Sequence, residues 1–295
     1  MSKVVTVMNM KGGVGKTTVS MNLAGAAAAW DFSERKVYNI LSIDYDPQFN
    51  LSQSLLKPAE YFQIEREKKT VLSVLIDNQE NLNPYQIQVP GSENPPPVNN
   101  IVTRIKTYKG HDNRYRTLDL IPSTLDLMYV ALGQANGNTK AMETRFEKFI
   151  EECKRKYDLI IIDCHPAGSF FTKTSLRQSD IVLIPVIPQK YSFRGIGLMM
   201  KFIEAKKRGT IAPKPLILLN HMPRVGITQQ EQEIRTDATY GPLCMVHTLK
   251  KYSAFADVDG GSNFAWESTK AYSTEASTNL FKVCDEFLQQ SGFTK

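Results

Sequence analysis

The segment Met10–Thr18 reads MKGGVGKTT, and it restricts the possible folds of this chain more than any other feature. The valine-rich run Val4–Met8 comes just before it, and the alanine-rich stretch Lys16–Trp30 begins within it. β-Branched residues favour a strand and alanines favour a helix, so the predicted order is strand, loop, helix. Glycines let such a loop wrap closely around a phosphate, and the N-terminus of the following helix attracts the anion. The sequence therefore predicts a phosphate-binding loop.

Short apolar runs alternate with helix-length segments along the rest of the chain, which is typical of parallel strands joined by crossover helices. Several runs are apolar almost throughout, as strands covered on both faces should be. We predict an α/β fold with a doubly wound, mostly parallel sheet flanked by helices, the P-loop NTPase fold. The predicted strands are Val4–Met8, Val37–Ile43, Leu118–Pro122, Leu159–Ile162, Ile181–Val186, Leu216–Leu219 and Cys244–Val246, and the predicted helices are Lys16–Trp30, Asn138–Lys156, Ser192–Lys207, Thr228–Thr239 and Ser273–Gln290.

Residues 78–116 depart from this rhythm. Prolines 90, 95, 96 and 97 preclude a helix there and break up any central strand. The basic, tyrosine-bearing second half, RIKTYKGHDNRYR, is interpreted as an edge hairpin or a partner surface, with a tolerated surface insertion as the alternative. No domain linker is visible, so we expect a single domain over residues 1–295 that carries this insertion.

The charge distribution bears on which partners the protein could bind. Hydrophobic residues make up 42% of the chain, and 36 Lys and Arg against 30 Asp and Glu give a net charge of +6. Residues 101–200 carry 15 basic and 10 acidic side chains, so the positive excess lies away from the glycine-rich loop. Such an excess can face a polyanion, although solvated helix faces give the same pattern.

Targeting and redox features point to a cytoplasmic protein. The four cysteines form no CxxC pair, which argues against a disulfide framework and a zinc site. No apolar run approaches the roughly 20 residues that span a bilayer. The first residues lack a signal-peptide layout. We expect no membrane partner.

Charged and hydroxyl side chains in and after the glycine-rich loop predict a nucleotide and metal site. Lys16 is expected to neutralise the β- and γ-phosphates, and the Thr17 hydroxyl to ligate Mg²⁺. The other loop residues expected to contact phosphate are Lys11, Gly12, Gly13, Val14, Gly15 and Thr18.

Carboxylates follow two predicted strands. Asp44 and Asp46, in LSIDYDPQFNLS, fall on the same side of an extended segment because strand side chains alternate. Asp163 ends the apolar run of YDLIIIDCHPAGSF, a Walker B arrangement that places a carboxylate beside the cation.

The loop also departs from the common pattern GxxxxGK[ST], because Met10 stands where that pattern has glycine and Lys11 is an additional lysine. KGGVGKT resembles the deviant Walker A motif, KGGxGK[ST], of the ParA/MinD family of P-loop ATPases. The segments IDYDPQFN, IIIDCHP, SDIVLIPV and LILLNHM extend the resemblance over most of the chain. Phe49 replaces a usual glycine, His165 replaces a usual proline, and the final third has only a loose counterpart.

The resemblance implies roles for individual residues. Lys11 would cross a homodimer interface to the partner's nucleotide, so that two ATP molecules lie between two subunits. Asp44 would support the hydration shell of Mg²⁺, and Asp46 would position the attacking water. Asn220 would read the adenine edge, with a strand-terminal turn as the alternative. His165 is interpreted as a loop residue without a mechanistic role.

The same resemblance implies a slow, stimulated ATP hydrolase that acts as a dimerisation switch. The ATP-bound homodimer would bind DNA non-specifically on the nucleoid, and a ParB-like or other cargo-bound protein would stimulate hydrolysis during partition. Because only nine residues precede Met10, the chain resembles short, non-repressor ParA proteins. By position, the expected DNA contacts are Arg224, Lys250 and Lys251, with Lys206, Lys207 and Arg208 as further candidates.

Sequence features argue against other roles within this superfamily. A MinD-like membrane switch should end in a basic amphipathic helix, whereas the last residues, LFKVCDEFLQQSGFTK, are nearly charge-balanced. A nitrogenase iron protein needs paired cysteines for its cluster, a spacing that Cys153 and Cys164 do not match. The cargo, whether plasmid, chromosome or protein assembly, is not indicated. A catalytically silent scaffold is disfavoured by the joint presence of Lys11, Lys16, Asp46 and Asp163.

Overall fold

In the computed structural model, a seven-stranded sheet forms the centre of the molecule. Residues 2–30, 37–80, 82–83, 86, 88–132, 139–165, 169–205, 212–255 and 264–293 are described. The strands are β1 (Lys3–Val7), β2 (Asn39–Tyr45), β3 (Thr103–Lys109), β4 (Tyr115–Ile121), β5 (Leu159–Cys164), β6 (Ile181–Val186) and β7 (Lys214–Leu219). They lie in the order β3-β4-β2-β5-β1-β6-β7, and all pairs are parallel except β3 with β4. The predicted fold class is confirmed.

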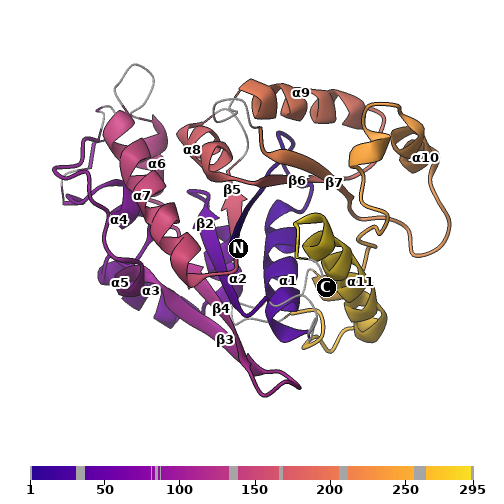
Figure 1. The fold of residues 1–295 in the computed structure, drawn as a ribbon, viewed down its shortest axis with the longest axis horizontal. Coiled ribbons are helices and arrows are strands. Elements are labelled where there is room, and N and C mark those ends of the chain that lie inside the picture. The colour runs from indigo at the N-terminus through magenta and orange to yellow at the C-terminus, as the bar shows by residue number, and fades with distance from the viewer. Residues whose placement is uncertain are drawn as a thin grey trace.

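Helices cover both faces of the sheet and give three layers (Figure 1). One face packs against α1, α2, α3 and α11, and the other packs against α4 to α10. The helices are α1 (Lys16–Ala29), α2 (Asn50–Leu55), α3 (Pro58–Arg66), α4 (Val71–Leu75), α5 (Val98–Ile101), α6 (Leu127–Leu132), α7 (Lys140–Lys156), α8 (Phe170–Gln178), α9 (Ser192–Ala205), α10 (Gln229–Thr236) and α11 (Ser273–Gln290). None of these helices is both long and apolar enough to cross a membrane, as far as the described residues go.

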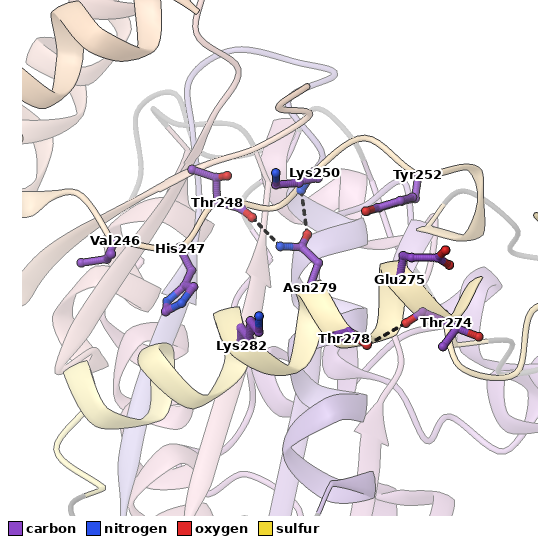
Figure 2. Close-up of a pocket in the computed structure, with 10 residues that line it drawn as sticks. All are labelled: Val246, His247, Thr248, Lys250, Tyr252, Thr274, Glu275, Thr278, Asn279 and Lys282. Atoms are coloured by element: carbon purple, nitrogen blue, oxygen red, sulfur yellow. Dashed lines mark hydrogen bonds between the residues drawn. The ribbon is translucent and has the colours of Figure 1, made fainter. Parts of the chain in front are cut away.

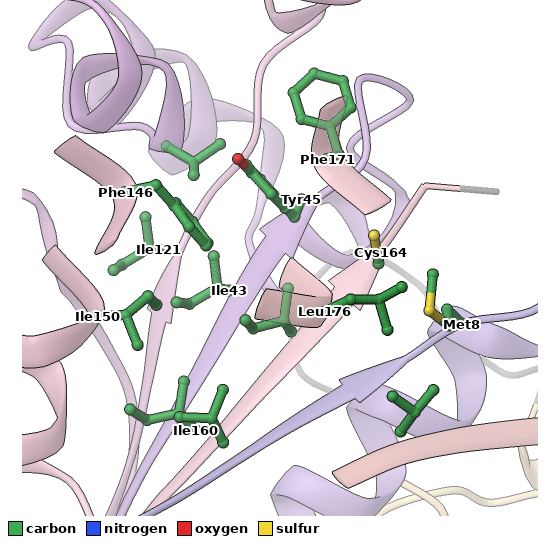
Figure 3. Close-up of a cluster of buried hydrophobic side chains, with 14 of the residues drawn as sticks. Met8, Ile43, Tyr45, Ile121, Phe146, Ile150, Ile160, Cys164, Phe171 and Leu176 are labelled. Carbon is green, nitrogen blue, oxygen red and sulfur yellow. The ribbon is translucent and has the colours of Figure 1, made fainter. Parts of the chain in front are cut away.

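The two hydrophobic cores share the strands, because successive side chains point to opposite faces. On β2, Ile40 packs into the core beneath α1 and α11, and Leu41 packs into the core beneath α7 and α8. At the end of β2, the Tyr45 ring stacks on Phe146 with ring centroids 4.6 Å apart (Figure 3). The Tyr45 hydroxyl lies 3.0 Å from the Thr174 hydroxyl. These contacts fix the end of β2, where the predicted carboxylates lie.

The segment 78–116 adds an edge hairpin to the sheet, as one of its two interpretations predicted. β3 pairs antiparallel with β4 and lies at one edge of the sheet. The hairpin extends away from the helical layers at the bottom of the view in Figure 1. Whether it also binds a partner stays a prediction.

The predicted strand Cys244–Val246 is wrong. Only an isolated bridge joins Cys244 to Ile217. Arg235 donates to the carbonyl oxygens of Met245 and Val246, at 3.0 Å and 3.1 Å, and Glu286 accepts from the Val246 N–H at 2.6 Å. Because side chains satisfy these backbone groups, the segment does not extend the sheet.

Most of the predicted helices are confirmed to within a few residues. α11 has the predicted bounds and α1 ends one residue early at Ala29. α10 is shorter than Thr228–Thr239, because Thr228 caps its N-terminus and the backbone becomes extended at Asp237. Two predicted ends, Asn138 and Lys207, lie outside the described residues. The short helices α2 to α6, together with α8, were not predicted. Of these, α5 contradicts the expectation that prolines preclude a helix in residues 78–116, because it begins directly after Pro97, which is its N-cap.

Candidate nucleotide and metal site

The glycine-rich loop joins β1 to α1 in the predicted order. Gly13 and Gly15 have φ angles of 72° and 83°, in the left-handed region that favours glycine. A Cβ atom on Gly15 would lie 2.5 Å from Nδ2 of Asn220, so a larger residue does not fit there. α1 begins at Lys16, and the N–H groups of its first turn have no partner within the helix. This geometry suits an anion, although phosphate contact by the loop residues stays a prediction.

Asp163 lies at the centre of the site. It is buried in β5, in register with Val7 of β1, and it accepts hydrogen bonds from the Thr17 hydroxyl at 2.8 Å and the Ser20 hydroxyl at 2.9 Å. Burial raises the pKa of Asp163 to about 6, and the hydrogen bonds from Thr17 and Ser20 oppose that rise. The chain thus holds a carboxylate in a place where a cation would relieve the cost of burying its charge.

Ser20 is a site residue that the sequence analysis missed. It follows Thr17 by three positions, a spacing that places both hydroxyls on one face of α1. That spacing could have identified it once Asp163 was assigned.

Asp44 lies beside Asp163, because the two residues are paired in register between β2 and β5. Its carboxylate is fully buried and accepts two hydrogen bonds from Ser52, from the backbone N–H at 2.8 Å and from the hydroxyl at 2.6 Å. Burial and the nearby charge of Asp163 raise the pKa of Asp44 well above its usual range. The structure therefore brings two predicted metal residues, Asp44 and Asp163, together with Thr17.

Asp46 is more exposed than Asp44. One of its carboxylate oxygens accepts the Gln48 N–H at 2.9 Å, and its own N–H donates to Asp44 at 3.3 Å. Besides burial, the charge of Asp46 contributes to the raised pKa of both Asp44 and Asp163. The three predicted carboxylates thus form one electrostatic cluster.

The donor set fits a magnesium ion bound together with phosphates. Carboxylate and hydroxyl oxygens are the hard ligands that Mg²⁺ prefers, and nucleotide sites complete its shell with phosphate and water. Among the described residues, no group of three or more His, Cys, Asp and Glu side chains could hold a metal unaided. The oxygen donors of Thr17, Asp44 and Asp163 therefore suit a Mg²⁺ ion whose remaining ligands are phosphate and water.

Lys11 has an exposed side chain on a fixed backbone. Its N–H donates to Oδ1 of Asn9 at 3.0 Å, and the amide of buried Asn9 donates to the Pro185 carbonyl oxygen at 2.7 Å. Its ammonium group hydrogen-bonds Gln189, which follows β6. The side chain of Lys11 is therefore exposed where a second molecule could approach.

Asn220 lies against the glycine-rich loop after the end of β7. Its side-chain amide donates to the Val14 carbonyl oxygen at 2.8 Å and accepts the His221 N–H at 2.8 Å. A cavity of about 420 Å³ opens beside it, and its lining extends from Thr18 of α1 to Lys251. The cavity therefore lies beside Asn220, the residue expected to read the adenine edge, and contact with a base stays a prediction.

The three predicted DNA contacts, Arg224, Lys250 and Lys251, line this same cavity. Lys250 Nζ donates to the Arg224 carbonyl oxygen at 2.6 Å, and the Arg224 guanidinium lies 4.3 Å from the centroid of the Tyr272 ring. The further candidates, residues 206–208, lie outside the described residues.

His165 follows β5 directly. Its N–H donates to the Tyr45 carbonyl oxygen at 3.3 Å, and its ring lies edge-on to Phe171. These contacts are those of a packed loop residue, and the absence of a mechanistic role stays a prediction.

Residues 2–212 match the family described as AAA domain. An uncharacterised protein of Methanocaldococcus jannaschii is 34% identical over 215 residues, which make up 73% of this chain and 70% of that protein. The sporulation initiation inhibitor protein Soj of Bacillus subtilis is 30% identical over 204 residues, 69% of this chain and 65% of Soj. The chain thus spans about two thirds of the length of these relatives, between 65% and 70%.

Solved structures share the fold. pNOB8 ParA superimposes with a TM-score of 0.68 and 17% identity, covering 98% of each chain, and the same protein bound to nonspecific DNA gives 0.62. A plasmid partition protein of Borrelia burgdorferi B31 bound to AMPPNP gives a TM-score of 0.64 at 19% identity, covering 98% of this chain and 100% of that one. These structures share only the fold, whereas the family match over residues 2–212 and the similarity to Soj show that the chain belongs to the ParA/MinD family of P-loop ATPases.

Proposed function

We propose that the chain binds ATP with Mg²⁺ and hydrolyses the terminal phosphate. The observation that carries this proposal is the hydrogen bond of 2.8 Å from the Thr17 hydroxyl to Asp163. Thr17 follows a loop that contains two left-handed glycines, Gly13 and Gly15. Thr17, Asp44 and Asp163 are the residues that would hold the metal, Asp44 through the metal's water shell. When bound, Mg²⁺ would neutralise charge that develops on the phosphoryl oxygens. The similar Borrelia protein holds an ATP analogue.

Other residues of the chain would bind the phosphates, the attacking water and the base. The loop N–H groups and Lys16 hold the phosphates, and the more exposed carboxylate of Asp46 orients the attacking water. Asn220 faces the cavity beside the loop and would contact the base. Lys11 acts on the nucleotide of a second subunit, which makes the active form a homodimer.

Replacing Thr17 with alanine tests the site, because Thr17→Ala removes the hydroxyl and keeps the backbone N–H. We expect Mg²⁺-dependent ATP turnover to fall about 10- to 100-fold, while the affinity for ADP measured in EDTA stays within about threefold. The control is Thr6→Val. Thr6 lies in β1, outside the site, and the variant removes its hydroxyl, which is hydrogen-bonded to the Ser179 hydroxyl at 2.6 Å. Wild-type turnover and Mg²⁺ dependence in Thr17→Ala would contradict the proposal.

We further propose that ATP turnover times a DNA-binding switch that partitions a cargo. A similar fold, pNOB8 ParA, has been solved on nonspecific DNA. A groove of about 700 Å³ lies between the segment Val246–Tyr252 and α11, with Lys250 at its rim (Figure 2). Lys250 and Tyr252 line both this groove and the nucleotide cavity. A nucleotide in the cavity beside Asn220 would therefore contact a wall shared with this groove, and the groove's two lysines, Lys250 and Lys282, would contact DNA phosphates.

The partner that stimulates hydrolysis would be a ParB-like or other cargo-bound protein, and the ATP-bound dimer would then reside on the nucleoid. Positive charge without a base-reading element suits binding to any duplex sequence. A protein cargo in place of a plasmid or chromosome is the alternative outcome.

The DNA surface is tested with the double variant Lys250→Ala/Lys251→Ala. At saturating AMPPNP and Mg²⁺, we expect weaker binding to a random-sequence duplex, and a slope of log affinity against log salt that is smaller by about two. Fluorescence anisotropy over a range of KCl concentrations measures both. The control double variant Lys148→Ala/Lys154→Ala removes the same charge from α7, on the opposite face of the sheet. Unchanged affinity and slope in Lys250→Ala/Lys251→Ala would sink the assignment.

A further inference from the structure

Two buried serines connect the two carboxylates that follow β2. Ser52, in α2, donates both its N–H and its hydroxyl to the Asp44 carboxylate, at 2.8 Å and 2.6 Å. The same Ser52 hydroxyl oxygen accepts the N–H of Ser123 at 2.9 Å. The Ser123 hydroxyl in turn donates to the Asp46 carbonyl oxygen at 2.7 Å. A continuous chain of hydrogen bonds therefore runs from the carboxylate of Asp44 to the main chain of Asp46.

Burial makes this connection specific. Ser52, Ser123 and Asp44 are all fully buried, so no water competes for their polar groups. A hydroxyl has one proton to donate, and Ser52 directs its proton to Asp44 while its lone pair takes the Ser123 N–H. Neither Ser52 nor Asp44 can rotate without leaving a buried polar group unpaired, which is unfavourable.

Aromatic packing holds the outer side of the same network. The Tyr61 hydroxyl of α3 shares its proton between a carboxylate oxygen of Glu65 at 3.0 Å and the Ser123 carbonyl oxygen at 3.2 Å. Its ring stacks on Phe49 with centroids 5.1 Å apart, and the Phe49 N–H donates to the Asp46 carbonyl oxygen at 2.9 Å. Phe49 has a left-handed φ of 43°, which glycine adopts more readily. The loop between Asp46 and Phe49 is therefore held from both sides.

We propose that Ser52 is a positioning residue that orients the Asp44 carboxylate toward the metal, and that Ser123 links this orientation to the main chain of Asp46. The inference rests on the proposed function, because it presumes that Asp44 acts on Mg²⁺ and Asp46 on the attacking water. Ser52 sets the affinity for the metal. Ser123 sets the placement of Asp46 and hence the rate of turnover.

Metal affinity tests Ser52 without relying on activity. The probe is Mn²⁺, measured by electron paramagnetic resonance on the ADP complex of the full chain. We expect Ser52→Ala to weaken Mn²⁺ binding about tenfold, with ADP affinity in EDTA unchanged. The matched control is Ser42→Ala, in the same strand as Asp44: Ser42 is fully buried, and its hydroxyl has no hydrogen-bond partner among the described residues. Ser42→Ala should bind Mn²⁺ as wild type does.

Ser123→Ala separates the two serines, because it keeps the N–H that bonds Ser52 and removes only the hydroxyl that bonds Asp46. We expect wild-type Mn²⁺ affinity and a kcat about tenfold lower at saturating ATP and Mg²⁺. This variant leaves the Asp44 contacts intact, so it tests the network even if Ser52→Ala does not fold.

Asp44→Asn distinguishes failure of the inference from failure of the proposed function. If Asp44→Asn weakens Mn²⁺ binding and Ser52→Ala does not, Ser52 is not a positioning residue. If Asp44→Asn itself binds Mn²⁺ as wild type does, the metal role of Asp44 is wrong and the inference falls with it. Equal weakening by Ser42→Ala and Ser52→Ala would show general damage to β2 and overturn the inference.

Discussion

At the scale of single residues, the glycine-rich loop depends on a close approach that the motif alone does not reveal. The pattern predicts glycine at position 15 because a loop around phosphate needs left-handed backbone. In this chain Asn220 supplies a second reason, since its amide would lie 2.5 Å from a Cβ atom on Gly15 and also holds the Val14 carbonyl oxygen. Asn220 therefore buttresses the loop, in addition to its predicted contact with the base.

The variant Gly15→Ala tests this packing without any ligand. We expect the free energy of unfolding to fall by at least about 1–2 kcal/mol, because alanine is strained in the left-handed region and would displace Asn220. Urea unfolding of the nucleotide-free chain measures the change. Gly13→Ala is the matched control, since Gly13 also has a left-handed φ but a Cβ atom there meets no atom within 4 Å, and its expected change is the backbone strain alone, about 1 kcal/mol. Similar losses in both variants would argue against the role of Asn220.

At the scale of elements, the sequence predicted those strands that are buried on both faces. β6 has the predicted bounds and β5 extends two residues beyond them, because an uninterrupted apolar run marks a strand clearly. α2 and α4 were missed because they have six and five residues, too few to show a helical period.

Side-chain partners explain other limits of the prediction. Arg145 of α7 looks like a surface charge in the sequence, yet it is buried and donates to the carbonyl oxygens of Ser73, Val74, Ser92 and Asn94. Those bonds attach the proline-rich segment to α4 and α7. No local pattern announces such a contact, because its acceptors lie about fifty to seventy residues away, at separations of 51 to 72.

The sequence analysis assigned Thr17, Asp44 and Asp163 to one metal site, but it did not predict the strand order that brings them together. That Asp44 and Asp163 are neighbours follows from the strand order and register, since β2 lies directly beside β5. Ser52 and Ser123 escaped the sequence analysis because their role exists only after α2 and the end of β4 fold against β2.

At the scale of the whole molecule, the candidate nucleotide site lies at the carboxyl ends of the parallel strands, as expected for an open α/β sheet. The β3–β4 hairpin turn lies at the start of β4, and therefore at the opposite ends of the strands. A partner bound to that hairpin would therefore leave the nucleotide site open to a second subunit. The exposed Lys11 is the residue through which the second subunit would act.

The last prediction is that dimerisation depends on Lys11. With AMPPNP and Mg²⁺ we expect the wild-type chain to run as a dimer in size-exclusion chromatography with light scattering, and as a monomer with ADP. Lys11→Ala should stay monomeric in both states and bind AMPPNP within about threefold of wild type, because only the contact across the interface is lost; its turnover should fall about 10³-fold, as when an arginine finger is removed.

Gln189→Ala provides the control, since it removes the hydrogen-bond partner of Lys11 within its own chain. If Lys11 serves the second subunit, this variant should still dimerise, because the lysine is released and not lost. A Lys11→Ala chain that dimerises with AMPPNP as the wild type does would show that Lys11 is an ordinary surface lysine. Monomeric Gln189→Ala with dimeric Lys11→Ala would instead place the interface at Gln189.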